Sequence, residues 1–280
     1  MTRSTLREDL LAGARPLDAV VLAAPSIALV AVFLLPEPTR RSLAFEYSAP
    51  TLTTAFTAHY VHLSAEHFLA NLAGYSLLAG VGYALAVAGR HRRFFLASLA
   101  TFCLGFPPVL SALNLAVPRH AVGFGFSGVN MALVGLLPLL LAVYAREHFS
   151  ASAPTRALPA VFFVLVGWIG FLALPTSLTG FGVAGLSVAV AGVLLGATYA
   201  LTSAGGGPSI RQWFREIRDR AGHGDLFAVG VVLLVAYPVI GFPAEPTVDG
   251  SVVNLYVHLL GFCLAFIGPY VVLVAGVFDE

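Results

Sequence analysis

Charged residues are scarce in this chain, and lysine is missing altogether. Asp, Glu, Lys and Arg make up 10% of the 280 residues, and all 15 basic residues are arginine. A soluble domain carries roughly 25% charged residues, so the composition excludes an ordinary soluble protein. The formal net charge of +1 gives no basic surface for nucleic acid, which we exclude as a partner.

Cysteine is almost as rare, since Cys103 and Cys263 are the two in the sequence and both lie in apolar runs. We expect no disulfide between them, and their spacing matches no metal-binding pattern. His59, His62 and His67 lie close together, but the chain has no HExxH motif, and their spacing spreads the rings around a helix. We therefore expect neither a metal nor a cofactor.

Long apolar runs take up most of the chain. The sequence is 58% hydrophobic with a mean hydropathy of +0.88, and each run is near the ~20 residues that a helix needs to cross a bilayer. This pattern predicts an all-α polytopic membrane protein with about eight transmembrane helices. The predicted spans are residues 17–35, 67–89, 94–117, 123–145, 158–174, 180–203, 226–243 and 251–277.

The distribution of arginine predicts the orientation of these spans. If the N-terminus is cytoplasmic, 12 arginines lie in inner segments and 3 in outer segments, in agreement with the positive-inside rule. We expect a cell-membrane protein with a cytoplasmic tail at residues 1–16. Residues 17–280 would form one membrane domain whose first apolar run is retained rather than cleaved. The basic segment 209–220 is either an interfacial helix or a solvated loop.

Two polar residues begin apolar spans on the same predicted side of the membrane. Ser127, in the GFSG segment 125–128, follows Arg119 by about eight residues, and His258 follows Asp249 by about nine. At 1.5 Å per residue, both side chains are expected roughly 10 Å below the outer surface. Because hydrocarbon makes an unused polar side chain costly, the pair indicates a catalytic site.

The residue types in this pair fit acyl transfer. Histidine is the usual base that takes the proton of a serine nucleophile near neutral pH. Asn71 and His67, four residues apart on one helix face, are candidate donors to the oxyanion that acyl transfer creates. Acidic residues are absent between Glu66 and Glu147, so the sequence predicts a serine–histidine dyad rather than a triad.

Small residues accompany both members of the pair. Gly261 and Ala265 follow His258 at i+3 and i+7, and Gly128 and Gly135 lie near the face of the serine. Small residues let membrane helices approach backbone to backbone, so we expect the imidazole to come within hydrogen-bond reach of the hydroxyl. Hydrolysis also needs water, so these groups should line a wet cavity open to the outside.

Three segments occur in a fixed order: HYVHLSAEHFLANL (59–72), GFSGVNMALVG (125–135) and VHLLGFCLA (257–265). In motif and order they resemble the rhomboid family of intramembrane serine proteases. The resemblance implies a rhomboid-like helical bundle with Ser127 as nucleophile, His258 as base, and His67 and Asn71 in the oxyanion hole. Supporting roles fall on the remaining motif residues: His62, Gly125, Gly128, Gly261 and Ala265. His62 would support the oxyanion region or the outer loop, with no role as the alternative.

The chain also departs from the family pattern. Rhomboids commonly have six core spans with the base on the sixth, whereas His258 lies on the predicted eighth. The family's Trp-Arg pair is missing from the first outer loop, PEPTRRSLAFEYSAP. Met131 occupies the position four residues after the nucleophile, where an aromatic side chain often packs on the catalytic histidine.

The resemblance and the polar pair predict an intramembrane serine endopeptidase that cuts membrane-anchored proteins near the outer face. Its partners would be transmembrane protein substrates and the lipid bilayer. One alternative is a catalytically inactive rhomboid-like factor that binds membrane segments. A small-solute transporter is the other alternative, disfavoured because no internal repeat occurs and the polar groups lie toward one face.

Overall fold

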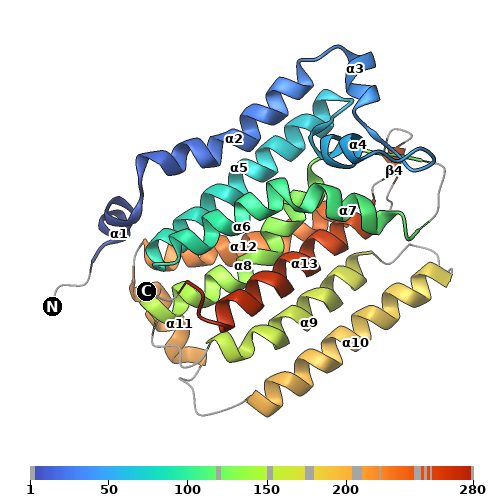
Figure 1. The fold of residues 1–280 in the computed structure, drawn as a ribbon. Helices are drawn as coiled ribbons and strands as arrows, with labels where there is room; N and C mark the ends of the chain where they lie inside the picture. Colours follow the sequence, from blue (N-terminus) through green and yellow to red (C-terminus); the bar gives the residue numbers. More distant parts are fainter. Residues whose placement is uncertain are drawn as a thin grey trace.

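The computed structural model describes residues 4–117, 121–149, 154–173, 180–203, 210–220, 222–242, 247–248, 251–252 and 254–278. These residues form a bundle of long helices whose axes run in similar directions (Figure 1). Arg119 and Asp249, on which the predicted depths of Ser127 and His258 depend, lie outside the described residues.

Most of the predicted spans correspond to long helices. Five are long and apolar enough to cross a membrane: α2 (Pro16–Phe33), α5 (Ala65–Ala88), α8 (Ser127–His148), α12 (His223–Gly241) and α13 (Leu255–Val274). The pair α6 (Arg92–Leu104) and α7 (Phe106–Asn114), bent by 48°, makes a sixth if it counts as one span. The described part of the chain is thus an all-α polytopic membrane protein with five or six such helices.

Two further apolar helices bear on the predicted count of eight. α9 (Pro154–Leu172) and α10 (Gly180–Ser203) pack against each other along their length (Figure 1). Within the described residues their apolar stretches are short, Ala157–Leu172 and Leu186–Thr198. Eight spans therefore stay a prediction.

Short elements lie at the ends of the bundle. They are α1 (Leu6–Gly13), α3 (Glu37–Ser42), α4 (Leu52–Thr57), the 3-10 turn η1 (Ala58–Tyr60), α11 (Ile210–Asp219), β1 (Phe45–Glu46), β2 (Val122–Gly123), β3 (Thr247–Val248) and β4 (Ser251–Val252). The basic segment 209–220 is thus helical over the residues of α11, as one of its two interpretations required. Strands β1 and β2 pair antiparallel, with Phe45 opposite Gly123.

The predicted start of the fourth span is wrong. A helix was expected from residue 123, but β2 covers Val122–Gly123 and α8 begins at Ser127. Gly125, between them, has φ of +112°, which no helix contains. Ser127 is therefore the first residue of its helix rather than one turn inside it.

Helix α8 lies at the centre of the bundle. Every residue from Gly128 to Ala145 is buried, because α8 packs against α5, α9, α12 and α13 (Figure 1). A helix that is apolar on all sides belongs in such a position. Of the five candidate spans found in the described residues, the one that begins with Ser127 is thus the most buried.

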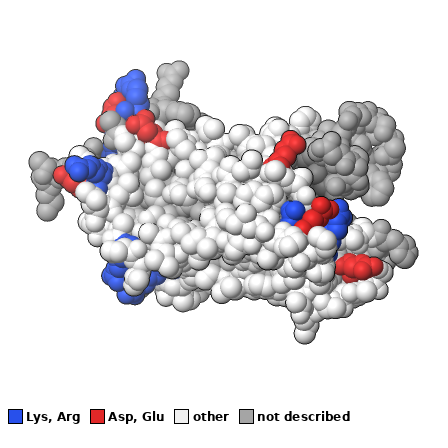
Figure 2. Space-filling view, turned by 90° about the horizontal axis from the view of Figure 1, so that it is seen from above, with Lys and Arg blue, Asp and Glu red and all other residues white. Residues whose placement is uncertain are grey.

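The outer surface of the bundle has the polarity of a membrane protein. Blue and red atoms gather toward the two ends of the molecule in Figure 2, with a broad uncharged zone between them. One acidic residue, Asp18 in the first turn of α2, is buried. Arg92 bonds both of its carboxylate oxygens, at 2.7 and 2.9 Å, and Tyr83 bonds one of them at 2.5 Å. An acid at the start of an apolar helix is tolerated because its charge is paired in this way.

Candidate active site

Ser127 and His258 meet at one end of the bundle, although 131 positions separate them in the chain. The Oγ atom of Ser127 lies 2.7 Å from Nε2 of His258. Ser127 is the first residue of α8, and His258 lies in the first turn of α13. The contact predicted from the sequence is therefore present.

The second ring nitrogen of His258 is held by the backbone. Nδ1 lies 2.5 Å from the carbonyl oxygen of Gly241. Since a carbonyl oxygen accepts and does not donate, Nδ1 carries the hydrogen, and the neutral ring keeps its lone pair at Nε2. Nε2 can therefore take the proton of the Ser127 hydroxyl, which is the arrangement that a general base requires.

The carbonyl group of Gly241 orients the imidazole ring of His258, as a carboxylate does in a catalytic triad. Gly241 is the last residue of α12, so its carbonyl is one of the four that have no acceptor role inside the helix. These carbonyls form the negative end of the helix dipole, equivalent to roughly half an elementary charge. A cation that forms on His258 would thus face partial negative charge without a side-chain acid.

The turn before Ser127 depends on a glycine. Gly125 has φ of +112°, and a Cβ atom there would lie 2.7 Å from Cε1 of the His67 ring. Any other residue would therefore be strained and would also collide with His67. This turn ends in Phe126 and presents the Ser127 side chain in a half-buried position at the start of α8.

His62 contacts the backbone of this turn. It is fully buried, and its Nε2 accepts a hydrogen bond of 3.4 Å from the backbone N–H of Phe126. Burial, with a smaller effect of His67, lowers the pKa of His62 to about 3. The ring is therefore neutral at pH 7 and can act as an acceptor. Arg40 in turn donates to the His62 carbonyl at 2.5 Å.

The neighbouring histidines have separate partners. His67 packs edge-on against His62, with ring centroids 4.8 Å apart. His59 is bonded at 3.1 Å to Ser111, whose hydroxyl donates to the carbonyl of Ala55. His59 thus contacts α7 through Ser111, and His62 and His67 lie against the turn that precedes Ser127.

Asn71 is buried on α5 and tied to α8. Its side-chain amide donates to the carbonyl of His67 at 3.0 Å. Asn130, three residues after Ser127, donates to the backbone carbonyl of Asn71 at 3.0 Å and to its side-chain oxygen at 3.3 Å. The amide has a second hydrogen, so Asn71 keeps one donor for another acceptor. Asn130 lies inside the segment 125–135, yet its residue type alone gave no reason to assign it a role.

Backbone packing of α8 against α13 brings the serine and the histidine together. A Cβ atom at Gly261 would overlap the carbonyl oxygen of Gly128, and one at Gly135 would overlap that of Phe262. Ala265, one turn further, is fully buried. Side chains larger than hydrogen at the two central glycines would push the helices apart.

An aromatic side chain packs on His258, but it does not come from the position four residues after Ser127. Phe242, directly after α12, packs edge-on against His258 with centroids 5.8 Å apart. Met131 is buried against Gly241, where a Cβ atom would lie 2.8 Å from its sulfur. In the sequence PVIGFP at 238–243, the Gly and the final Pro predict that a helix ends there. Nothing in the sequence indicates that this helix end contacts His258.

Asn254 fixes the start of α13. Its side-chain oxygen accepts from the backbone N–H of Val257 at 3.2 Å, and its amide donates to Asn114 at 3.1 Å and Tyr47 at 3.2 Å. It therefore caps the helix of His258 and ties that helix to two other segments.

We expect Asn254→Ala to lower the free energy of unfolding by about 1 kcal/mol, the usual loss of an N-cap. Asn254→Asp keeps the capping oxygen and removes both amide donors, so it separates capping from anchoring. Thermal unfolding in detergent measures both variants. Equal stability of Asn254→Ala and the parent protein would rule out this role.

No family model, no curated protein and no solved structure matches this chain.

Proposed function

We propose that this protein is an intramembrane serine endopeptidase, similar to the rhomboid proteases, that cleaves membrane-anchored proteins with a Ser127–His258 dyad. The observation that carries the proposal is the 2.7 Å hydrogen bond between Oγ and Nε2, with Nδ1 held by the Gly241 carbonyl. It gives nucleophile, base and orienting group in one chain of contacts, as acyl transfer requires.

In the first step, Ser127 Oγ attacks the carbonyl carbon of the scissile peptide bond while its proton passes to Nε2 of His258. The substrate oxygen becomes negative. In the proposal it is received by the backbone N–H of Ser127, at the positive end of α8. Asn71 and His67 are the proposed additional donors.

In the second step, the carbon–nitrogen bond breaks, and the proton on Nε2 passes to the leaving amine. An ester of Ser127 remains. His258 then takes a proton from a water molecule, whose oxygen attacks the carbonyl carbon of the ester. The bond between that carbon and Ser127 Oγ breaks, His258 returns the proton to Oγ, and the new carboxyl end is released.

The proposal also includes the membrane in which the protein lies and its orientation there. The arginine distribution favours a cytoplasmic N-terminus in the cell membrane, which puts the dyad toward the outer face. Substrates would then be proteins whose transmembrane segments present a peptide bond near that face.

A serine-directed fluorophosphonate tests this function directly. We expect it to form one covalent adduct per chain, on Ser127, because a fluorophosphonate reacts with a serine whose proton has an acceptor. Intact-protein mass spectrometry, followed by peptide mapping, measures the adduct.

The matched control is Ser76→Ala, which removes a serine hydroxyl of α5 that bonds the Leu72 carbonyl. This variant should be labelled like the parent protein, and His258→Ala should not be labelled. A folded protein that binds transmembrane peptides but resists the probe would instead support the inactive binding factor.

A further inference from the structure

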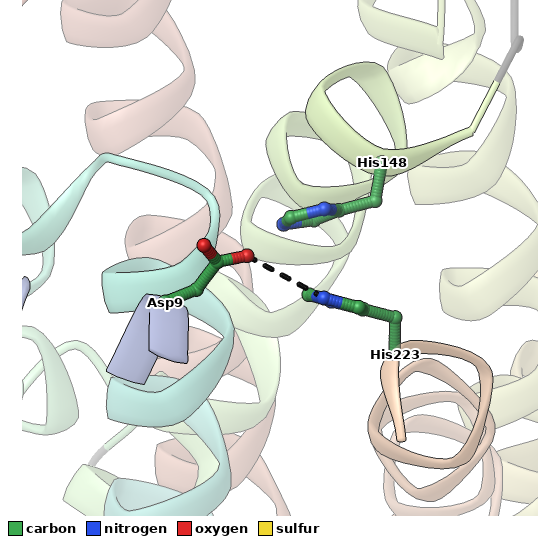
Figure 3. A group of neighbouring side chains, drawn as sticks. All are labelled: Asp9, His148 and His223. Atoms are coloured by element: carbon green, nitrogen blue, oxygen red, sulfur yellow. Dashed lines mark ion pairs between the residues drawn. The ribbon is translucent and has the colours of Figure 1, made fainter. Parts of the chain in front are cut away.

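Three potential metal ligands converge at the end of α8 that lies opposite Ser127. His148 is in the last turn of α8, His223 is the first residue of α12, and Asp9 is in α1. One ligand atom from each residue lies within 4.8 Å of the others. Figure 3 shows the two imidazole rings one over the other, both extending toward the carboxylate.

Both imidazoles are held in place by a second contact. Nε2 of His148 lies 2.9 Å from the carbonyl oxygen of Ala88 and must donate to it. Tyr144 donates its hydroxyl hydrogen to the carbonyl of His223 at 3.1 Å, so Nδ1 of His223 donates to the Tyr144 oxygen at 2.8 Å. Each neutral ring keeps one lone pair, at Nδ1 of His148 and at Nε2 of His223. Histidines that bind metals are oriented by such contacts.

The atoms that face one another have no hydrogen bond. Nε2 of His223 and Oδ2 of Asp9 lie 3.4 Å apart, and both are buried without a hydrogen-bond partner. A separation of about 3.4 Å is the edge of a tetrahedron around Zn²⁺ with bonds of about 2.0–2.1 Å. Buried polar atoms without partners require an explanation, and a shared cation supplies it.

A cavity adjoins the group. It has a volume of about 410 Å³ and is lined by Asp9 and His148 together with Arg90, Glu147 and Arg220. Arg90 is paired with Glu147 at 3.1 Å, and Arg220 lies over the Phe149 ring at 5.8 Å. The cavity gives an ion a path to Asp9 and His148, which line it, and leaves room for a water molecule as a fourth ligand.

We propose that Asp9, His148 and His223 bind a divalent transition-metal cation of the zinc class, which ties α1 to the ends of α8 and α12. Two imidazoles and one carboxylate suit Zn²⁺ better than Mg²⁺ or Ca²⁺, which take oxygen ligands. The site lies away from the dyad and does not depend on the proposed peptidase activity.

Zinc binding to the whole purified protein tests this site. The protein in detergent is stripped with EDTA, given Zn²⁺ and passed through a desalting column, and bound zinc is measured by mass spectrometry. We expect one zinc per chain and a higher thermal midpoint with zinc. Co²⁺ in its place should give the visible absorption bands of a tetrahedral ion.

Asp9→Asn keeps the shape of the side chain and should lose both the bound zinc and the zinc-dependent rise in thermal midpoint. Tyr144→Phe removes the partner of His223 and should weaken zinc binding about 10- to 100-fold. The control His91→Gln removes a histidine outside the group, whose Nδ1 bonds the Gly89 carbonyl, and should bind zinc like the parent.

Two results would overturn the proposal. Equal zinc binding by Asp9→Asn and the parent protein would place the ion elsewhere. No zinc on the folded parent protein would leave Asp9 and His223 as neighbouring side chains, 3.4 Å apart, that share no ion. Both are read without any measurement of peptidase activity.

Discussion

Replacing His258 by alanine is expected to reduce cleavage of a transmembrane substrate by about four to six orders of magnitude, the loss that serine proteases show without their base. The physical reason is the contact of 2.7 Å between Nε2 and Ser127 Oγ. Without it the hydroxyl keeps its proton and is a weak nucleophile. The bundle should stay folded, because the change removes a side chain without adding one.

The measurement is the turnover rate in proteoliposomes that contain a fluorogenic transmembrane substrate. Ser127→Ala should lose as much activity as His258→Ala, and the double variant should lose no more than either, because residues that act as one unit are not additive. His91→Ala serves as the control histidine. Cleavage by His258→Ala within tenfold of the parent rate would refute the dyad.

Gly261→Ala is expected to have the second-largest effect. The added Cβ would overlap the carbonyl oxygen of Gly128, which directly follows Ser127. A backbone oxygen cannot rotate away, so α13 must shift relative to α8 and carry His258 with it. Overpacking of this kind costs about 1–3 kcal/mol, and a shift of about 1 Å at a reacting group can cost about a hundredfold in rate.

The same helix offers a matched control. A Cβ at Gly268 would meet nothing within 4 Å, so Gly268→Ala should leave activity unchanged and stabilise the helix by up to about 1 kcal/mol. Thermal midpoint and fluorophosphonate labelling measure both variants. If the two substitutions behaved alike, close contact of α8 with α13 would not position the dyad.

The apolar runs predicted where the long helices lie, since a run of about 20 apolar residues is typical of a transmembrane helix. The helix periodicity of Gly261 and Ala265 also predicted which face of α13 meets α8. The start of α8 could not be predicted, because residues 123–126 are glycine and phenylalanine, which continue the apolar run. The pairing of β1 with β2 is a contact between distant segments, which no local pattern reveals.

Partners supplied by the backbone or by distant segments were also invisible in the sequence. Gly241 orients His258 through a carbonyl group, which every residue has, so no residue type marks it. Asp9, His148 and His223 are separated by more than 70 residues at each step, and no spacing pattern connects them. Such groups are recognised only when the helices are assembled.

The use of a main-chain carbonyl to hold His258 has a further consequence for a protein in lipid. A triad with an acid would require a permanent anion in surroundings of low dielectric constant, where an isolated ion costs several kcal/mol. With Gly241 in that position, the resting assembly is electroneutral. Charge separation would arise only while a substrate is being attacked, so no counter-ion has to be kept beside the dyad between turnovers.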